Sequence, residues 1–93
     1  MSLQLLQLAV PASGDTGPGA GRSVRDLSHK TLQIVGGEGS WDVQISLNGT
    51  DFSTILSGVD PGGIYILEHA CSHVRINALV NTVAPVVWLA GHN

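Results

Sequence analysis

The sequence predicts an all-β protein, an antiparallel β-sandwich or jelly-roll-like barrel with an extended N-terminal arm. Apolar and polar residues alternate from Trp41 to Asn48, and the run ends in Asn48-Gly49. This pattern is typical of a half-buried strand that enters a tight hairpin. Strand-like runs then recur about every eight to twelve residues, with glycine-bearing turns between them, as in sandwiches and barrels.

The first predicted element is an apolar strand or arm near the N-terminus. No Lys or Arg precedes Leu3, and Gln4 and Gln7 interrupt the apolar run, so an arm fits better than a cleaved secretory leader. The run is also shorter than the roughly twenty apolar residues of a membrane helix. Because apolar residues fall on both of its faces, we expect the arm to bind a neighbouring chain. The expected contact residues on the arm are Leu3, Leu5, Leu6, Leu8 and Val10.

A low-complexity segment, Pro11 to Arg22, follows the arm. It holds four glycines and two prolines among small polar residues, a composition that favours a flexible linker without regular pairing. An ordinary long loop over the sheet is the equal alternative. We therefore predict two parts, an arm and linker over residues 1–22 and a β-sandwich domain over residues 23–93.

The expected strands of the sandwich cover residues 31–35, 41–47, 52–56, 64–67, 74–80 and 85–90. Residues 64–67 are apolar on both faces, which suits a strand covered on both sides. The aromatic residues Trp41 and Phe52 are expected in the core. Trp88 suits either the core or an interface, and it completes the set of expected partner contacts.

The composition indicates that the chain associates with other subunits. Charged residues make up 12% of the sequence, about half of the usual share of about 25%. The single cysteine, Cys71, excludes an internal disulfide framework that could stabilise so small a core. The four basic residues are dispersed and the net charge is −3, so no nucleic-acid partner is expected.

The candidate chemical residues do not form a recognisable active site. His69, Cys71 and His73 would share one side of a strand, but residues four apart on a strand are separated by about 13 Å, too far for one metal ion. The carboxylates fall mostly in turns, where Asp caps the local backbone. We therefore expect no enzymatic activity, no cofactor and no bound metal.

Three segments resemble small structural proteins of tailed phages. They are Asp26–Ile34 (DLSHKTLQI), Trp41–Phe52 (WDVQISLNGTDF) and Ser72–Ile76 (SHVRI). The related patterns are D-L-S-x-K-T-x-Q-V, S-x-D-G-T-x-W and x-Y-V-R, and the likeness covers residues 24 to 90. The chain departs from them at Asn48, in place of an acidic residue, at Phe52, in place of Trp, and at His73.

This resemblance implies a capsid decoration, or cement, protein. Such chains are β-rich modules that bind the outer surface of the capsid, commonly as trimers, and fasten neighbouring subunits of the major capsid protein. We therefore expect this chain to form a homo-oligomer, with a trimer favoured. In the resembled families the arginine equivalent to Arg75 commonly braces the sheet, and Asp42 and Asp51 are its candidate partners here. The expected location is the virion, with synthesis in the host cytoplasm and no membrane partner.

The same segments are also similar to discoidin-like carbohydrate-binding sandwiches, which carry S-x-D-G-x-x-W followed by Y-V-R-I. Such modules are considerably longer than this chain. The alternative function is therefore a carbohydrate- or receptor-binding β-sandwich module of a phage tail or secreted protein. A sugar site would need an exposed aromatic ring to stack on the sugar, and Trp88 is the candidate.

Overall fold

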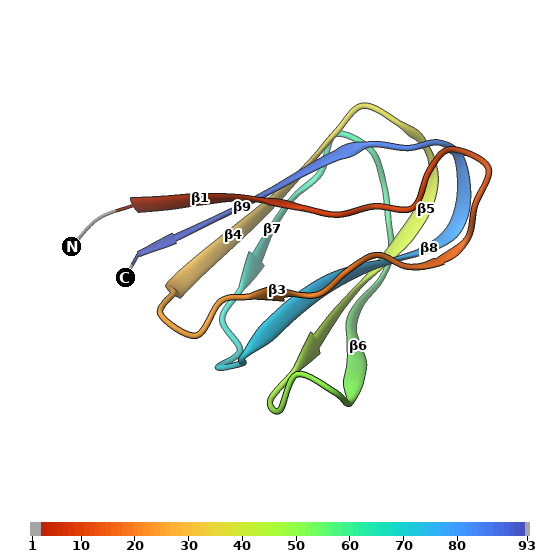
Figure 1. Cartoon of the computed structure of the whole chain (residues 1–93). Coiled ribbons are helices and arrows are strands. Elements are labelled where there is room, and N and C mark those ends of the chain that lie inside the picture. The colour runs from red at the N-terminus through yellow and green to blue at the C-terminus, as the bar shows by residue number, and fades with distance from the viewer. Residues whose placement is uncertain (1–2, 93) are drawn as a thin grey trace.

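A computed structural model describes residues 3–92 and confirms the predicted all-β sandwich of two antiparallel sheets (Figure 1). Residues 1–2 of the predicted arm and residue 93 of the predicted sandwich lie outside the described residues. Sheet A has the strand order β1 (Leu3–Leu8), β9 (Val86–His92), β4 (Ser28–Val35) and β7 (Ile64–Leu67). Sheet B has the order β2 (Gly17–Pro18), β8 (His73–Val83), β5 (Glu38–Ser46) and β6 (Phe52–Val59), and β3 (Arg22–Ser23) also pairs with β8.

The core lies between the two sheets and is built by period-two alternation. With buried polar exceptions such as Lys30 and Asn81, alternate side chains of the long strands face the opposite sheet and are apolar. Burying each of them contributes about 1.5–3 kcal/mol of hydrophobic free energy. The largest fully buried side chains include Leu32, Ile34, Trp41, Val43, Ile76 and Leu89. The prediction that Trp41 is a core residue is confirmed.

Phe52 does not lie in the core, so that prediction is wrong. Its ring is half-buried, and the guanidinium of Arg75 lies over it at 4.0 Å from the ring centroid. The hairpin register places Phe52 opposite Ser46 and Thr54 opposite Gln44, so Phe52 shares the outer face of sheet B with Gln44. A two-residue turn at Asn48-Gly49 would have placed Phe52 opposite Ile45, and the longer turn moves its side chain to the other face.

The N-terminal arm is an edge strand of this chain's own sandwich. β1 pairs antiparallel with β9 from Leu3 opposite His92 to Leu8 opposite Val87. The two strands lie side by side in Figure 1, with both chain ends at the same end of the sandwich. Residues 3–8, 17–18 and 22 therefore pair with strands of the predicted sandwich domain, residues 23–93.

The glycine-rich segment is folded onto β8, contrary to the prediction of a linker without regular pairing. Gly17 and Pro18 pair with Ala78 and Asn77. In Figure 1 the segment turns back at the end of β1 and returns alongside β8. At Gly19 any side chain would collide with the carbonyl of Ala9. Glycine here permits the close backbone approach with which the segment closes on itself.

Asn81 fixes this segment from inside the sandwich. Its side chain is 3% exposed. The amide nitrogen donates to the carbonyls of Pro11, Ala12 and Asp15 at 2.9–3.0 Å, and its oxygen accepts from the Trp41 indole N–H at 3.1 Å. One buried amide thus connects the core to the segment that composition alone classifies as flexible.

The hairpin at Asn48-Gly49 is confirmed, but its turn is longer than predicted. β5 ends at Ser46 and β6 begins at Phe52, and only Gly49 of the pair has a positive φ, at 81°. The Asn48 side-chain oxygen accepts hydrogen bonds from the backbone N–H groups of Thr50 and Asp51, both at 2.9 Å. This Asx-type turn replaces the two-residue turn in which both central residues have positive φ.

Candidate functional site

The outer side of sheet A, which faces away from the core, carries apolar side chains on each of its four strands, with Gln7, Thr31 and Gln33 among them. Its most exposed large side chains are Leu3 (64%), Leu5 (62%), Ile64 (64%) and Ile66 (70%). We define the apolar face by its apolar residues: Leu3, Leu5, Val35, Ile64, Ile66, Val86, Trp88 and Ala90.

Strand register makes this face continuous from one edge of sheet A to the other. Ala90 lies opposite Leu5 on one side and Thr31 on the other, and Thr31 lies opposite Ile66. The neighbouring row contains Trp88 between two glutamines, and its far end is Ile64. Directly opposed residues on one face of a sheet lie about 4.5–5.5 Å apart, so these side chains form one surface.

The apolar face carries no charge. Within β1, β4, β7 and β9, all in the described part of the chain, Lys30 is the only Asp, Glu, Lys or Arg. Its side chain points the other way. It is 3% exposed, and its Nζ donates to the carbonyl of His69 at 3.0 Å. A lysine buries its methylene stem readily when its ammonium finds such an acceptor.

The size of this face indicates an interaction surface. At the observed exposures its side chains present on the order of 600 Å² of apolar area, the upper end of the range for contiguous patches on soluble monomers. Stable protein interfaces bury about 800 Å² on each partner, and their centres are poor in charged residues. The apolar face has the extent and the composition of such a centre.

The structure brings together three of the six predicted partner contacts. Leu3, Leu5 and Trp88 share the apolar face. Leu8 is 2% exposed, so its side chain is not accessible to a partner, and Leu6 and Val10 pack against the core. This division follows from the pairing of β1 with β9, because alternate side chains of β1 then face inward.

Sequence reasoning missed the contribution of β4 and β7 to this face. Residues 64–67 were expected to be covered on both sides, but Ile64 and Ile66 face solvent. The apolar residues on both faces of residues 64–67 were a signal of this surface, because such a strand needs a packing partner on each face. In the single chain only one side of β7 is covered. Val35 and Val86 could not be assigned to the same surface without the pairing that places them opposite each other.

The outer side of sheet B has a different character, because polar groups there bind one another. Arg75 donates to the side-chain oxygen of Gln44 at 2.7 Å, and Gln44 donates to Thr54 at 3.1 Å. The expected pairing of Arg75 with Asp42 or Asp51 is replaced by these contacts. Asp42 instead accepts the backbone N–H of Gly58 at 2.9 Å. Sheet B also exposes three apolar side chains toward the end of β8, those of Leu79, Val80 and Val83.

The groups considered for chemistry lie near the end of the sandwich where Lys30 enters. Burial raises the pKa of the Cys71 thiol, and the nearby Lys30 ammonium opposes this shift in part. The Nδ1 atom of His73 lies 2.8 Å from the hydroxyl of Ser72. Among residues 3–92 no group of three or more His, Cys, Asp or Glu side chains is arranged to hold a metal ion.

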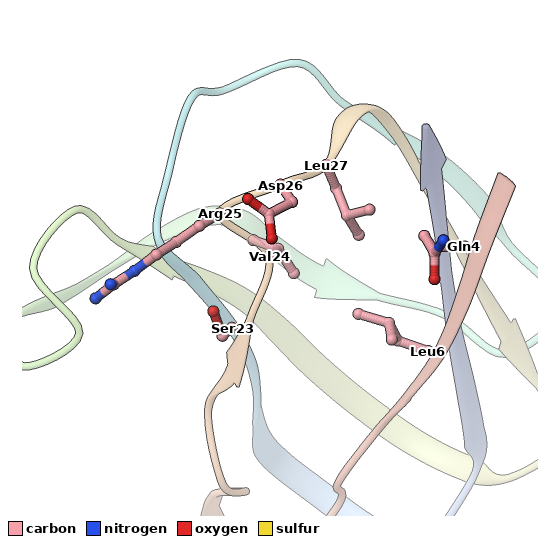
Figure 2. A pocket seen from close by; sticks show the side chains of 7 residues that line it. All are labelled: Gln4, Leu6, Ser23, Val24, Arg25, Asp26 and Leu27. Carbon is pink, nitrogen blue, oxygen red and sulfur yellow. The ribbon is translucent and has the colours of Figure 1, made fainter. Parts of the chain in front are cut away.

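Two hollows lie at the surface, one beside the β5–β6 hairpin and one beside β1. A hollow of about 550 Å³ lies beside the hairpin and is lined mainly by apolar groups, among them Ile45, Leu47 and Ile55. A smaller one of about 190 Å³ lies between β1 and residues 23–27 (Figure 2). In Figure 2 Leu6 and Leu27 extend into the space between these segments, whereas Arg25 points away from it.

Comparison of the chain with protein-family models, curated proteins and solved structures finds no match in any of the three. The described residues include no helix of the length and apolar character needed to cross a membrane.

Proposed function

We propose that this chain is a non-enzymatic structural protein of a phage particle, which binds the outer surface of the capsid and stabilises the shell. The observation that carries the proposal is the uncharged apolar face of sheet A. The resemblance of residues 24–90 to capsid decoration proteins supplies the class of partner, a major capsid protein.

The proposed mechanism is mechanical. Each bound copy covers a joint between capsid subunits, so opening that joint also exposes the apolar face to water. Covering on the order of 600 Å² at about 25 cal/mol per Å² corresponds to about 15 kcal/mol before the costs of association. The costs of association cancel much of this free energy, and repetition of the contact over the capsid lattice raises the overall avidity.

The test compares two single lysine substitutions that change the net charge equally. Ile66→Lys introduces a charge on the apolar face at an edge strand, where a lysine can extend into water in the free chain. Ser57→Lys places the same charge at an exposed position of β6 in sheet B. Both variants should keep the far-UV circular dichroism spectrum of the unaltered chain.

Binding is measured by co-sedimentation with empty shells of the phage that encodes the chain. We expect Ile66→Lys to weaken binding at least tenfold, because the interface would bury an unpaired charge. We expect Ser57→Lys to bind as the unaltered chain does. Equal binding by all three proteins would refute the assignment of the apolar face to the shell.

A second candidate function rests on one observation, the position of Trp88 between Gln7 and Gln33 on an open sheet surface. An indole flanked by amide side chains is a combination that binds sugars, since the ring stacks and the amides donate and accept hydrogen bonds. Binding to a glycan array that is lost in Trp88→Ala, with no binding to shells, would favour this candidate over capsid decoration.

A further inference from the structure

We propose that β1 pairs edge to edge with β1 of a second copy of this chain, antiparallel and about a two-fold axis at Gln4. The two A sheets would then form one continuous eight-stranded sheet. This inference rests on the proposed function in one respect: the pairing would join two apolar faces into a single docking surface for the shell.

The first step is to identify which backbone groups of β1 face outward. In an antiparallel pair, the N–H and C=O of one residue point to the partner strand and those of the next point away. Arg22 donates to the carbonyl of Gln7 at 3.1 Å, and Arg22 lies on β3, beyond the edge of sheet A. The backbone groups of Gln7 therefore point away from β9, and by alternation so do those of Leu3 and Leu5.

The far side of sheet A supports this assignment independently. The N–H and C=O of Ile34 bond to Gly63 and Gly62, on the side of β4 away from β9. Gln33 therefore points to Trp88, and Trp88 points to β4 rather than to Gln7. Gln7 must then direct its own groups to the free edge.

The second step concerns what protects this edge. Native edge strands usually carry a charge, a proline, a bulge or a covering loop that blocks pairing with another chain. β1 has the sequence LQLLQL, and its pairing with β9 runs without a bulge. Arg22 covers the edge at Gln7. Toward Leu3 the passing segment Ser23–Leu27 leaves the 190 Å³ hollow instead of packing against β1 (Figure 2).

Arg22 also determines the register of the proposed pair. A two-fold axis at Leu5 would require the Gln7 carbonyl, which Arg22 already occupies. An axis at Gln4 places Leu3 opposite Leu5 of the second copy, and these pairs do not need the Gln7 carbonyl. Two such hydrogen-bonded pairs exchange four N–H···O bonds across the axis.

A second copy fits this edge better than an unrelated strand for two reasons. Among the described residues the opposed pairs in this register are Leu3 with Leu5 and Gln4 with Gln4, so no like charges meet there. The pairing also gathers the exposed Leu3 and Leu5 side chains of both copies on one face. Two joined apolar faces present on the order of 1,200 Å², above the roughly 800 Å² that each partner of a standard interface buries.

The short pairing predicts weak association in solution, so the test traps it covalently. Gln4→Cys is prepared in a Cys71→Ser background. At a non-hydrogen-bonded pair the Cβ atoms lie about 4.5–5.5 Å apart, close enough for a disulfide after a small adjustment. Gln7→Cys in the same background is the matched control, because it is a glutamine on the same strand but away from the axis.

On mild oxidation we expect Gln4→Cys to form a species of twice the 9.7 kDa chain mass at least tenfold faster than Gln7→Cys. Adding Leu5→Pro removes an N–H that points to the free edge and leaves the β1–β9 bonds in place. This added substitution should lower the rate of disulfide formation of Gln4→Cys to that of Gln7→Cys, while the circular dichroism spectrum is retained. Equal rates for the two cysteines would overturn the inference.

The outcomes for the edge and for the shell are separable. Selective cross-linking together with shell binding that is insensitive to Ile66→Lys would leave the pairing intact and refute the proposed function. Shell binding that is sensitive to Ile66→Lys, without selective cross-linking, would refute the pairing alone. A trimer in solution whose Gln4→Cys variant forms no disulfide would also overturn the inference.

Discussion

Replacing Asn81 by leucine should destabilise the fold more than any other conservative change of a polar residue on β8. The substitution keeps the volume of the side chain and removes all its hydrogen bonds. The indole N–H of Trp41, which is fully buried, then has no acceptor from position 81. A buried unsatisfied donor costs about 1–3 kcal/mol.

The lost contacts to the N-terminal segment add to this cost. The amide of Asn81 has two hydrogens shared among three carbonyls, and each net hydrogen bond contributes about 1 kcal/mol. Water can reach part of the segment once it opens, so we expect a total loss of about 3 kcal/mol. A domain of this size has about 5–15 kcal/mol of stability.

The assay is urea unfolding followed by far-UV circular dichroism, which does not depend on the tryptophan signal. Asn77→Leu, on the outer side of the same strand, is the matched control and should change stability by less than about 0.5 kcal/mol. In a Trp41→Phe background the Asn81→Leu penalty should fall by about 1–2 kcal/mol, because no indole N–H remains to be satisfied. Trypsin should also cleave after Arg22 faster in Asn81→Leu.

The reasoning would be refuted if Asn81→Leu unfolded within 0.5 kcal/mol of the unaltered chain and kept the same resistance to trypsin. That result would mean that the segment is held by its strand pairs alone.

Three further predictions concern other parts of the fold. Gly39→Ala should cost about 2 kcal/mol or more in urea unfolding, because φ is +147° and a Cβ would collide with the Val80 carbonyl. A variant as stable as the unaltered chain would contradict this close approach of Gly39 to Val80. Cys71 should react with iodoacetamide more slowly in the folded chain than in urea at pH 8, since burial raises its pKa. Stability should decline as pH rises past the ordinary thiol pKa, where the unfolded state loses its proton first. Equal alkylation rates in the folded chain and in urea would contradict the burial of this thiol. Arg75→Lys should cost about 1 kcal/mol, because lysine loses the guanidinium stacking on Phe52; Arg25→Lys, at an exposed position, is the control and should be neutral.

The sequence predicts the sandwich because alternation and turn residues act locally. Trp41 is predicted correctly as a core residue, since Trp41, Val43 and Ile45 alternate with polar residues in the sequence. Phe52 is predicted wrongly because the turn is longer than the two residues of Asn48-Gly49, which places Phe52 opposite Ser46 rather than Ile45; the length of a turn depends on side-chain hydrogen bonds that alternation does not report.

The N-terminal segment shows the same limit at longer range. Its glycines indicate flexibility by composition, yet Asn81, more than sixty residues away in sequence, supplies the hydrogen bonds that order it. The apolar face could be predicted only in part for a similar reason. Leu3, Leu5 and Trp88 carried a signal of their own, whereas Val35 belongs to the surface only through its pairing with Val86.

The most direct test of the central claim, that the apolar face of sheet A is the surface buried in the working assembly, is hydroxyl-radical footprinting of the chain free and bound to shells. We predict that oxidation of Trp88, Leu5 and Ile66 falls several-fold on binding, while oxidation of Phe52 on sheet B stays unchanged. Protection of Phe52 with undiminished oxidation of the apolar face would contradict the account.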